Sequence, residues 1–170
     1  MPIFDIRYNS KLEEVELVYP NGKTDVLATD SPTEPIKSPD KTKAVYISPL
    51  EWEAPGSLYL VDLKIGEQEE LVVPEDGYIP KNVIWQDDEH VLVIIGFGDG
   101  TVAVGGNIYS VNIKTKDRAP ITEYDDNVQI SDLHLEDGVL HYRGIKYNDE
   151  NFMKSEIYTN KIVLDSLKAY

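Results

Sequence analysis

The chain contains the run Leu58-Tyr59-Leu60-Val61-Asp62-Leu63, and related runs follow at residues 108–113 (IYSVNI) and 157–162 (IYTNKI). The three runs are offset by 50 and then 49 residues. A fixed period of this length is typical of a stack of similar supersecondary units, in which neighbouring units bury each other's apolar faces. The repeat therefore predicts the architecture of the chain, and by itself it carries no chemistry.

Each repeat is predicted to contain four short antiparallel strands, with the repeated run as the third of them. Short runs of β-branched and aromatic residues separated by turn residues are the pattern of an all-β protein. The nearly continuous apolar run at residues 91–95 (VLVII) indicates a strand that is covered on both faces. The expected strands are 36–39, 44–48, 58–63, 70–73, 82–85, 91–95, 108–113, 119–122, 128–135, 139–143 and 156–163, with a further pair at 15–19 and 24–28 and only weak strand formers at 165–170.

We expect a single domain over residues 1–170, because a chain of this length can bury one substantial core. An N-terminal partial unit would span 1–30, and the repeat units would span about 34–74, 80–122 and 128–165. These three to four propeller-like, four-stranded units are few for a propeller, which has roughly four to eight blades. The alternatives are an irregular propeller, in which the N-terminal strands complete the C-terminal unit, and an incomplete, open β stack.

The third repeat predicts its own strand register through a two-residue turn at Asp137-Gly138. This turn pairs Leu135 with Leu140 and so collects the apolar side chains on one face. It places His134 opposite His141 on the other face. A slip of one residue would mix the two faces, so the pattern favours this register.

The segment Ser38-Pro39-Asp40-Lys41-Thr42-Lys43-Ala44-Val45-Tyr46 resembles the S-P-D-G-x-x-(I/L)-A-(Y/F) signature of WD40-like propeller repeats, found in TolB-type periplasmic proteins and prolyl-peptidase propellers. Lys41 stands where the signature has Gly, and the second repeat has Trp85-Gln86-Asp87-Asp88 in place of the motif. The chain is also similar to small Bacillota domains of unknown function, which implies a bacterial protein. Propeller families include binding scaffolds and enzymes, so the resemblance implies a fold and no single activity.

Composition excludes several classes of function. The net charge of −15 repels phosphate backbones, so we expect no nucleic-acid partner. The absence of cysteine removes disulfides and thiolate chemistry. No apolar run is long enough for a transmembrane segment, and the first residues lack the pattern of a signal peptide. We therefore expect a cytoplasmic protein by default, and an extracytoplasmic one if an N-terminal signal has been removed.

The order of strands in an antiparallel unit assigns each loop to one of two ends of the stack. Twelve acidic and two basic residues fall at one end, which we call the acidic end; the other end has eight acidic and seven basic residues. The loops of the acidic end are 29–35, 49–57, 74–80, 97–106, 122–128 and 145–155. This asymmetry indicates that the two ends have different roles.

The long loops of the acidic end also carry aromatic residues. Aromatic side chains on loops above a rigid scaffold are typical of ligand or partner recognition. The alternative is that the rings fold back to cover the stack while the carboxylates are merely solvated. The predicted binding residues are Glu51, Trp52, Glu53, Phe97, Asp99, Tyr147, Asp149, Glu150 and Phe152.

Two groups of residues are secondary candidates for a metal. His134 and His141, as cross-strand neighbours, have the ligand chemistry of zinc, while Asp125 and Asp126 offer the hard oxygen ligands that calcium prefers. Neither group has the spacing of a known metal site, so we expect no cofactor, with Ca²⁺ as the alternative. No G-x-S-x-G nucleophile motif is present.

These features predict a non-enzymatic, propeller-like binding or interaction module whose acidic end faces a protein partner or a small cationic ligand. A hydrolase or metal-dependent enzyme that uses carboxylates of the same end is one alternative. A structural module that completes a propeller by dimerisation is another, and the sequence leaves open whether the chain is a monomer or a homodimer.

Overall fold

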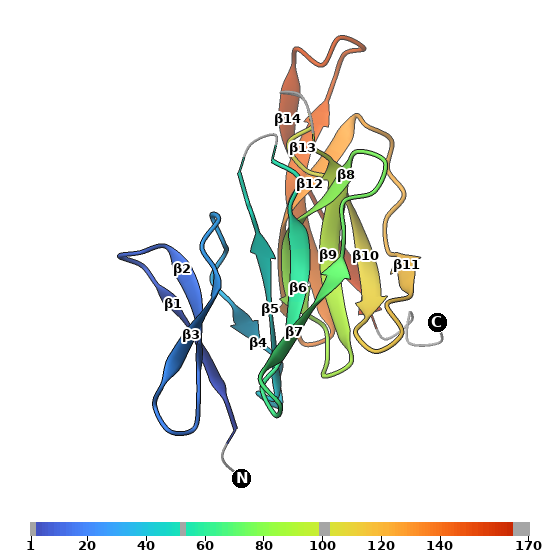
Figure 1. Ribbon diagram of the computed structural model, residues 1–170. Coiled ribbons are helices and arrows are strands. Elements are labelled where there is room, and N and C mark those ends of the chain that lie inside the picture. Colours follow the sequence, from blue (N-terminus) through green and yellow to red (C-terminus); the bar gives the residue numbers. More distant parts are fainter. Residues whose placement is uncertain (1–2, 52–53, 99–102, 165–170) are drawn as a thin grey trace.

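The computed structural model describes residues 3–51, 54–98 and 103–164. In these residues the chain forms fourteen β-strands and no α-helix (Figure 1). The strands are arranged in four separate antiparallel sheets of three or four strands. The predicted all-β fold of propeller-like units is therefore confirmed.

The four sheets follow one another along the chain, and we name them A to D in that order. Sheet A contains β1 (Asp5–Asn9), β2 (Glu14–Val18) and β3 (Thr24–Ala28). Sheet B contains β4 (Ile36–Lys37), β5 (Lys43–Ser48), β6 (Ser57–Asp62) and β7 (Glu67–Val72). Sheet C contains β8 (Tyr78–Trp85), β9 (His90–Phe97), β10 (Asn107–Asn112) and β11 (Arg118–Pro120). Sheet D contains β12 (Val128–Glu136), β13 (Val139–Tyr147) and β14 (Ser155–Val163).

Every strand expected from the repeat is present, although several bounds differ by a few residues. The N-terminal pair is in fact a sheet of three strands, because β1 precedes it. The expectation that N-terminal strands complete the C-terminal unit is wrong: β1 to β3 pair only with one another, and β12 to β14 form a different sheet. Residues 165–170, with their weak strand formers, lie outside the described residues. Within residues 3–51, 54–98 and 103–164 the sheets form an open stack with no closed ring.

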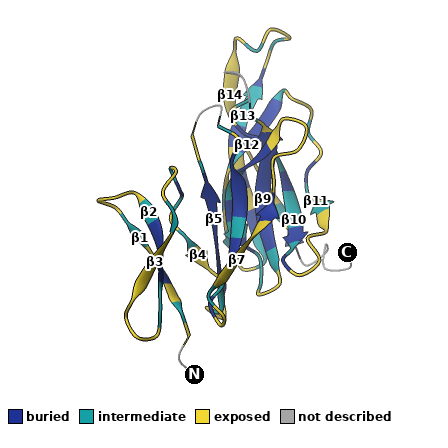
Figure 2. Ribbon diagram, viewed as in Figure 1, coloured by how far each residue is buried: buried dark blue, intermediate teal, exposed yellow. Residues whose placement is uncertain are grey.

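Three apolar clusters hold the four sheets together in the order A, B, C, D. Ile6 and Leu17 of sheet A pack against Tyr46 of sheet B. Leu60 of sheet B packs with Val93 of sheet C in the second cluster. The third cluster joins Leu92, Ile94 and Ile108 of sheet C to Ile130 and Leu140 of sheet D. Because successive residues of a strand point to opposite faces, sheets B and C bury both faces, and β5 and β9 are buried along most of their length (Figure 2).

The register predicted for the third repeat is confirmed. Leu135 lies opposite Leu140, and His134 lies opposite His141. The turn residues Asp137 and Gly138 have φ values of 51° and 77°, which is the geometry that a two-residue hairpin loop requires at both positions.

The segment that resembles the propeller signature forms a tight turn between β4 and β5. Asp40 accepts hydrogen bonds from the Thr42 amide at 3.0 Å, the Ser38 hydroxyl at 2.7 Å and the Thr42 hydroxyl at 2.8 Å. These hydrogen bonds lower the pKa of Asp40 to about 2, and the one from the Thr42 amide contributes more than those from the two hydroxyls. Lys41, where the signature has Gly, has a φ of 61°. The signature residues therefore have a structural role in this turn.

Asp40→Asn tests this turn through the pH dependence of stability. A carboxylate whose pKa is lowered on folding stabilises the protein above the pKa of the unfolded chain, 3.8, and this stabilisation is lost as the pH falls toward about 2. We expect the wild type to be more stable than Asp40→Asn at neutral pH, and the difference to shrink between these two values. Urea unfolding at a series of pH values measures it, and a difference that is constant with pH would contradict the prediction.

The loops of the acidic end lie together at one end of the stack, opposite the end that carries the N-terminus (Figure 1). Backbone hydrogen bonds join neighbouring loops of this end in pairs. The Leu50 amide donates to Ser31, the Gly98 amide to Gly77, and the Tyr147 amide to Asn127. Each bond joins a loop between two sheets to a loop within the sheet that follows.

Candidate functional site

A cavity of about 400 Å³ lies in the acidic end, above the ends of β9 and β10 and beside the start of β12. We call it the acidic-end cavity. Aromatic rings and carboxylates dominate its lining, and no Lys or Arg lines it among the residues that the structure describes. The aromatic residues are Tyr78, Phe97, Tyr109, Tyr124 and Phe152, and the acidic ones are Asp125 and Asp126. Residues from four loops of the acidic end, 74–80, 97–106, 122–128 and 145–155, thus meet in one place.

The rings differ in how firmly they are held. Phe97 is 44% exposed and packs edge-on against Tyr78, with ring centroids 5.8 Å apart. The Tyr124 hydroxyl lies 2.8 Å from the hydroxyls of both Tyr142 and Tyr158. Burial, with a smaller contribution from the Tyr124 hydroxyl, raises the pKa of Tyr142 well above its usual range. The cavity therefore has a fixed wall at Tyr124 and an accessible ring at Phe97.

The two carboxylates stand in an exposed turn before β12. The turn is closed by backbone contacts: the Val128 amide donates to the Asp125 carbonyl, and the Gln129 side-chain amide donates to the Asp126 carbonyl. Neither carboxylate forms an ion pair with any base of the described residues. Both are therefore available to a positively charged group.

Hydrogen bonds behind the cavity hold residues 103–106 of sheet C and join them to sheet D. Lys81, half-buried, donates from Nζ to the carbonyls of Ala103 at 2.5 Å and Gly105 at 2.9 Å. Its burial lowers the pKa of the ammonium to about 8. Gly106 forms two backbone hydrogen bonds with Ile130, each 2.9 Å long, which join sheet C to sheet D. These contacts hold the loop beneath the cavity in place.

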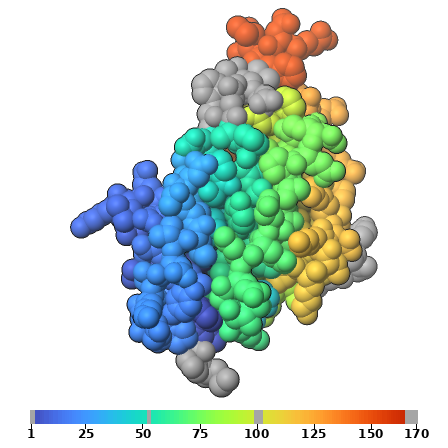
Figure 3. Space-filling view, viewed as in Figure 1, coloured from blue at the N-terminus to red at the C-terminus, as the bar shows by residue number. Residues whose placement is uncertain are grey.

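The turn between β13 and β14 projects beyond the rest of the acidic end (Figure 3). Tyr147 is buried and packs edge-on against Phe152, with ring centroids 5.1 Å apart. The Asp149 carboxylate accepts hydrogen bonds from the amides of Met153 and Lys154 and shapes the turn. Glu150 is exposed. In this loop, only Phe152 of the predicted binding residues lines the cavity.

Of the other predicted binding residues, those that the structure describes do not line the cavity. Glu51 accepts a hydrogen bond from the Ser31 hydroxyl and lies at the sheet B part of the acidic end. Trp52, Glu53 and Asp99 lie outside the described residues. Sequence reasoning missed Tyr78, Tyr109 and Tyr124, because a single Tyr within a strand or a short loop carries no signal of its own.

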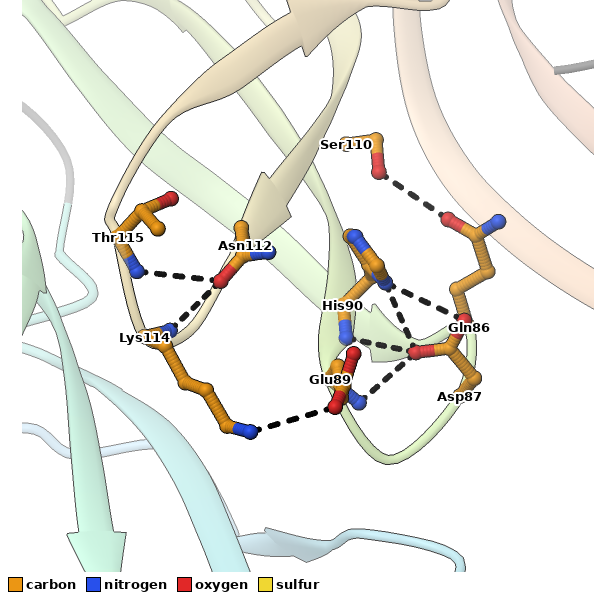
Figure 4. A network of polar contacts seen from close by, with 8 residues as sticks. All are labelled: Gln86, Asp87, Glu89, His90, Ser110, Asn112, Lys114 and Thr115. Atoms are coloured by element: carbon orange, nitrogen blue, oxygen red, sulfur yellow. Dashed lines mark hydrogen bonds and ion pairs between the residues drawn. The ribbon is translucent and has the colours of Figure 1, made fainter. Parts of the chain in front are cut away.

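A second hollow, of about 770 Å³, lies on sheet C near the opposite end (Figure 4). Asp87 Oδ1 lies 3.0 Å from His90 Nδ1, and Ser110 is on the same sheet face. The Ser110 hydroxyl donates to Gln86 Oε1 at 3.1 Å, away from the His90–Asp87 pair. Burial opposes the ionisation of Asp87, but hydrogen bonds from Glu89 and His90 lower its pKa overall. His90 is thus held in a structural turn rather than freely solvated, and Ser110 is not bonded to it as a nucleophile is to its base.

The metal candidates are also placed by the structure. His134 and His141 are cross-strand neighbours with ring centroids 6.2 Å apart, and His134 lies 3.4 Å from Glu136. Within the described residues, no group of three or more His, Asp or Glu side chains could hold a metal ion. Asp125 and Asp126 line the acidic-end cavity instead.

The fold and the cavity define the class of protein to which the chain belongs. It is an open stack of propeller-like sheets with an acidic, aromatic cavity at one end. The chain belongs to the family DUF4652, described as a domain of unknown function, which matches residues 50–164. No WD40 repeat family is identified in it. No curated protein is significantly similar to the chain.

Three solved structures have similar folds. A candidate conserved lipoprotein from Clostridium novyi NT is 23% identical, with a TM-score of 0.73 over 96% of this chain and 97% of that chain. Oligopeptidase B from Leishmania major is 13% identical, with a TM-score of 0.59 over 92% of this chain and 22% of that chain. The β-propeller domain of the trilobed protease from Pyrococcus furiosus, described as having an open velcro topology, is 11% identical, with a TM-score of 0.51 over 94% of this chain and 52% of that chain. At these identities the likeness is one of fold.

The described part of the chain contains no helix that is long and apolar enough to cross a membrane.

Proposed function

We propose that the chain is a non-enzymatic binding or interaction module, and that its acidic-end cavity takes an ammonium or guanidinium group. That group would belong to a small cationic ligand or to a basic segment of a protein partner. The observation that carries the proposal is the lining of the cavity, which combines five aromatic rings with two carboxylates and, among the described residues, no Lys or Arg.

Cations are attracted to the faces of aromatic rings, and this attraction strengthens when the site excludes water. Phe97 is accessible enough to meet such a group, while Asp125 and Asp126 supply the opposite charge at the rim. The surrounding loops add to the effect, because twelve acidic residues at one end raise the local concentration of cations. The cavity volume of about 400 Å³ fits a small ligand or the end of one side chain.

The fold of the Clostridium novyi NT protein, described as a candidate lipoprotein, supports a location outside the cytoplasm for this chain as well. We propose that location. Fractionation of cells that express the native gene, with antibody detection of the protein in the cytoplasmic and extracytoplasmic fractions, tests it.

The binding proposal is tested with tetramethylammonium chloride as the probe and tert-butanol as its uncharged counterpart. We expect the cation to shift the NMR signals of Phe97 and Tyr124, with a dissociation constant on the order of 1–10 mM, and the alcohol to leave them unchanged. Phe97→Leu should weaken binding by roughly 2- to 30-fold, which corresponds to a cation–π energy of about 0.5–2 kcal/mol.

The double variant Asp125→Asn/Asp126→Asn should weaken binding by roughly 2- to 30-fold, since each partly exposed charge contributes about 0.2–1 kcal/mol. Its matched control is Asp30→Asn/Glu34→Gln, which removes the same charge from the acidic end but away from the cavity. Equal effects of the two double variants, or equal binding of tert-butanol, would argue against this cavity as a cation site.

A further inference from the structure

Sheets A and D, the first and last of the stack, are each covered on one face only. Sheet A uses Ile6, Val15 and Leu17 to pack on sheet B, so its alternate residues face away from the stack. Sheet D likewise packs on sheet C through Leu140 and Tyr142 and leaves its other face open. Sheets B and C have no such face.

The open face of sheet D is apolar at its margins and positively charged at its centre. Ile157 is 66% exposed on this face. Next to it lies a shallow hollow of about 610 Å³ whose lining includes Arg143, Lys161, His134 and His141, with Asp132 as its one carboxylate. In a chain with a net charge of −15, this concentration of nitrogen bases is unusual.

The open face of sheet A combines carboxylates with an exposed apolar side chain. Glu16 lies opposite Arg7 and Val26 in one row across the sheet, and Asp5 and Glu14 belong to the same face by alternation along their strands. Arg7 Nε lies 2.7 Å from Glu16 Oε1. Val26 is 52% exposed beside them. Glu16 is buried and paired with Arg7, and the Asp5 carboxylate lies 2.6 Å from Lys37 Nζ of sheet B, so Glu14 is the one carboxylate of this face without an ion pair among the described residues.

The chain has about half the length of a complete propeller domain of similar fold. It covers 52% of the trilobed protease propeller domain, so two copies span about the length of one such propeller. Two stacks of four sheets supply eight sheets in total, which is within the range of roughly four to eight blades for propellers.

We infer that two copies of this chain close into one ring, in which sheet A of each copy packs on sheet D of the other. The two contacts are related by a two-fold axis, so the open faces of sheets A and D are covered in both copies at once. The arrangement brings Glu14 of each copy to the face of the other copy that carries Arg143 and Lys161, and it buries Val26 and Ile157. Because the contact joins unlike faces, it would generate an open fibre if the geometry did not close after two copies.

Analytical ultracentrifugation and native mass spectrometry of the full chain test the ring. We expect a species of twice 19.2 kDa that resists dilution and weakens with added salt, because charges of opposite sign meet at both contacts. A monomer at all concentrations up to about 100 µM, where a contact of micromolar affinity would be saturated, overturns the proposal. A series of growing oligomers also overturns it, since the ring would then not close.

Three variants with an exposed apolar residue changed to Asp locate the contact. Val26→Asp on sheet A and Ile157→Asp on sheet D should each reduce the affinity by at least about 100-fold, because each charge enters both contacts of the ring. Ile65→Asp is the matched control, because Ile65 is 58% exposed in a turn away from both faces. Thermal unfolding of each monomer verifies that the fold is intact.

Mixing the two interface variants distinguishes this ring from other dimers. The intact sheet D of Val26→Asp can pack on the intact sheet A of Ile157→Asp, so the mixture should regain a dimer that neither variant forms alone. A dimer that packs sheet D on sheet D would be insensitive to Val26→Asp and would not be restored by mixing. Either of those results contradicts the ring.

Discussion

Gly106→Ala is expected to lower the free energy of unfolding by about 3 kcal/mol or more, and the melting temperature by roughly 6–12 °C. A methyl group at this position would lie 2.1 Å from the Ile95 carbonyl oxygen and 2.6 Å from the Cα of Gly96. These are backbone atoms of the neighbouring strand, so no side chain can rotate away to make room. The strands would have to separate, and the bridge between Gly106 and Ile130 would open.

Gly22→Ala is the control for this prediction. Gly22 has a φ of 88°, and a methyl group there would meet nothing within 4 Å. The substitution therefore measures only the cost of placing an alanine in the left-handed region, about 1–2 kcal/mol. Denaturant unfolding of both variants compares them. If Gly106→Ala cost no more than Gly22→Ala, the close approach of the strands beneath the cavity would be wrong.

The stacked sheets could be predicted from the sequence because their determinants are local. The repeated third strand and the apolar run of β9 identify the units, and the Asp137-Gly138 turn fixes the register of β12 and β13. β1 was missed because the segment Asp5–Asn9 buries only Ile6. Whether the single chain closes into a ring could not be predicted, because it depends on which sheet the N-terminal strands join and no local pattern specifies that.

The candidate site was predicted only in part. The choice of the acidic end and of Phe97 and Phe152 came from loop order and composition, which the sequence contains. The grouping of Asp125 and Asp126 with those rings was missed, because the two carboxylates, although assigned to the acidic end, were singled out only as metal ligands. Lys81 was missed for a different reason: it sits at a β-bulge between Pro80 and Asn82, and such an irregularity re-aims a side chain without a sequence signal.

The cavity and the proposed ring are independent features of the molecule. The cavity is built from sheets C and D within one copy, whereas the contacts between copies use the outer faces of sheets A and D. Loss of the dimer in Ile157→Asp should therefore leave the response to tetramethylammonium unchanged. The two proposals can accordingly fail separately.

Leu17→Ala is expected to cost about 2–5 kcal/mol and to make sheet A unfold before the rest of the chain. Leu17 is buried in the cluster that joins sheets A and B, and sheet A has no other neighbour among the four sheets. In a linear stack, stability is close to a sum of contacts between neighbours, so the loss falls on one contact. The family match begins at residue 50, between β5 and β6 of sheet B, and so does not include sheet A.

Hydrogen exchange followed by mass spectrometry measures the effect, because it reports the stability of each sheet separately. In Leu17→Ala, the amides of β2 should exchange much faster while those of β9 keep their protection. The control is Leu92→Ala, an equally large truncation at a residue buried between sheets C and D. In this variant the protection of the amides should decrease in both sheet C and sheet D. If Leu17→Ala lowered protection equally in all four sheets, the chain would unfold as a single cooperative unit. The expectation of one domain over residues 1–170 would then hold in the strict thermodynamic sense, and sheet A would be coupled to the rest more strongly than one apolar cluster explains.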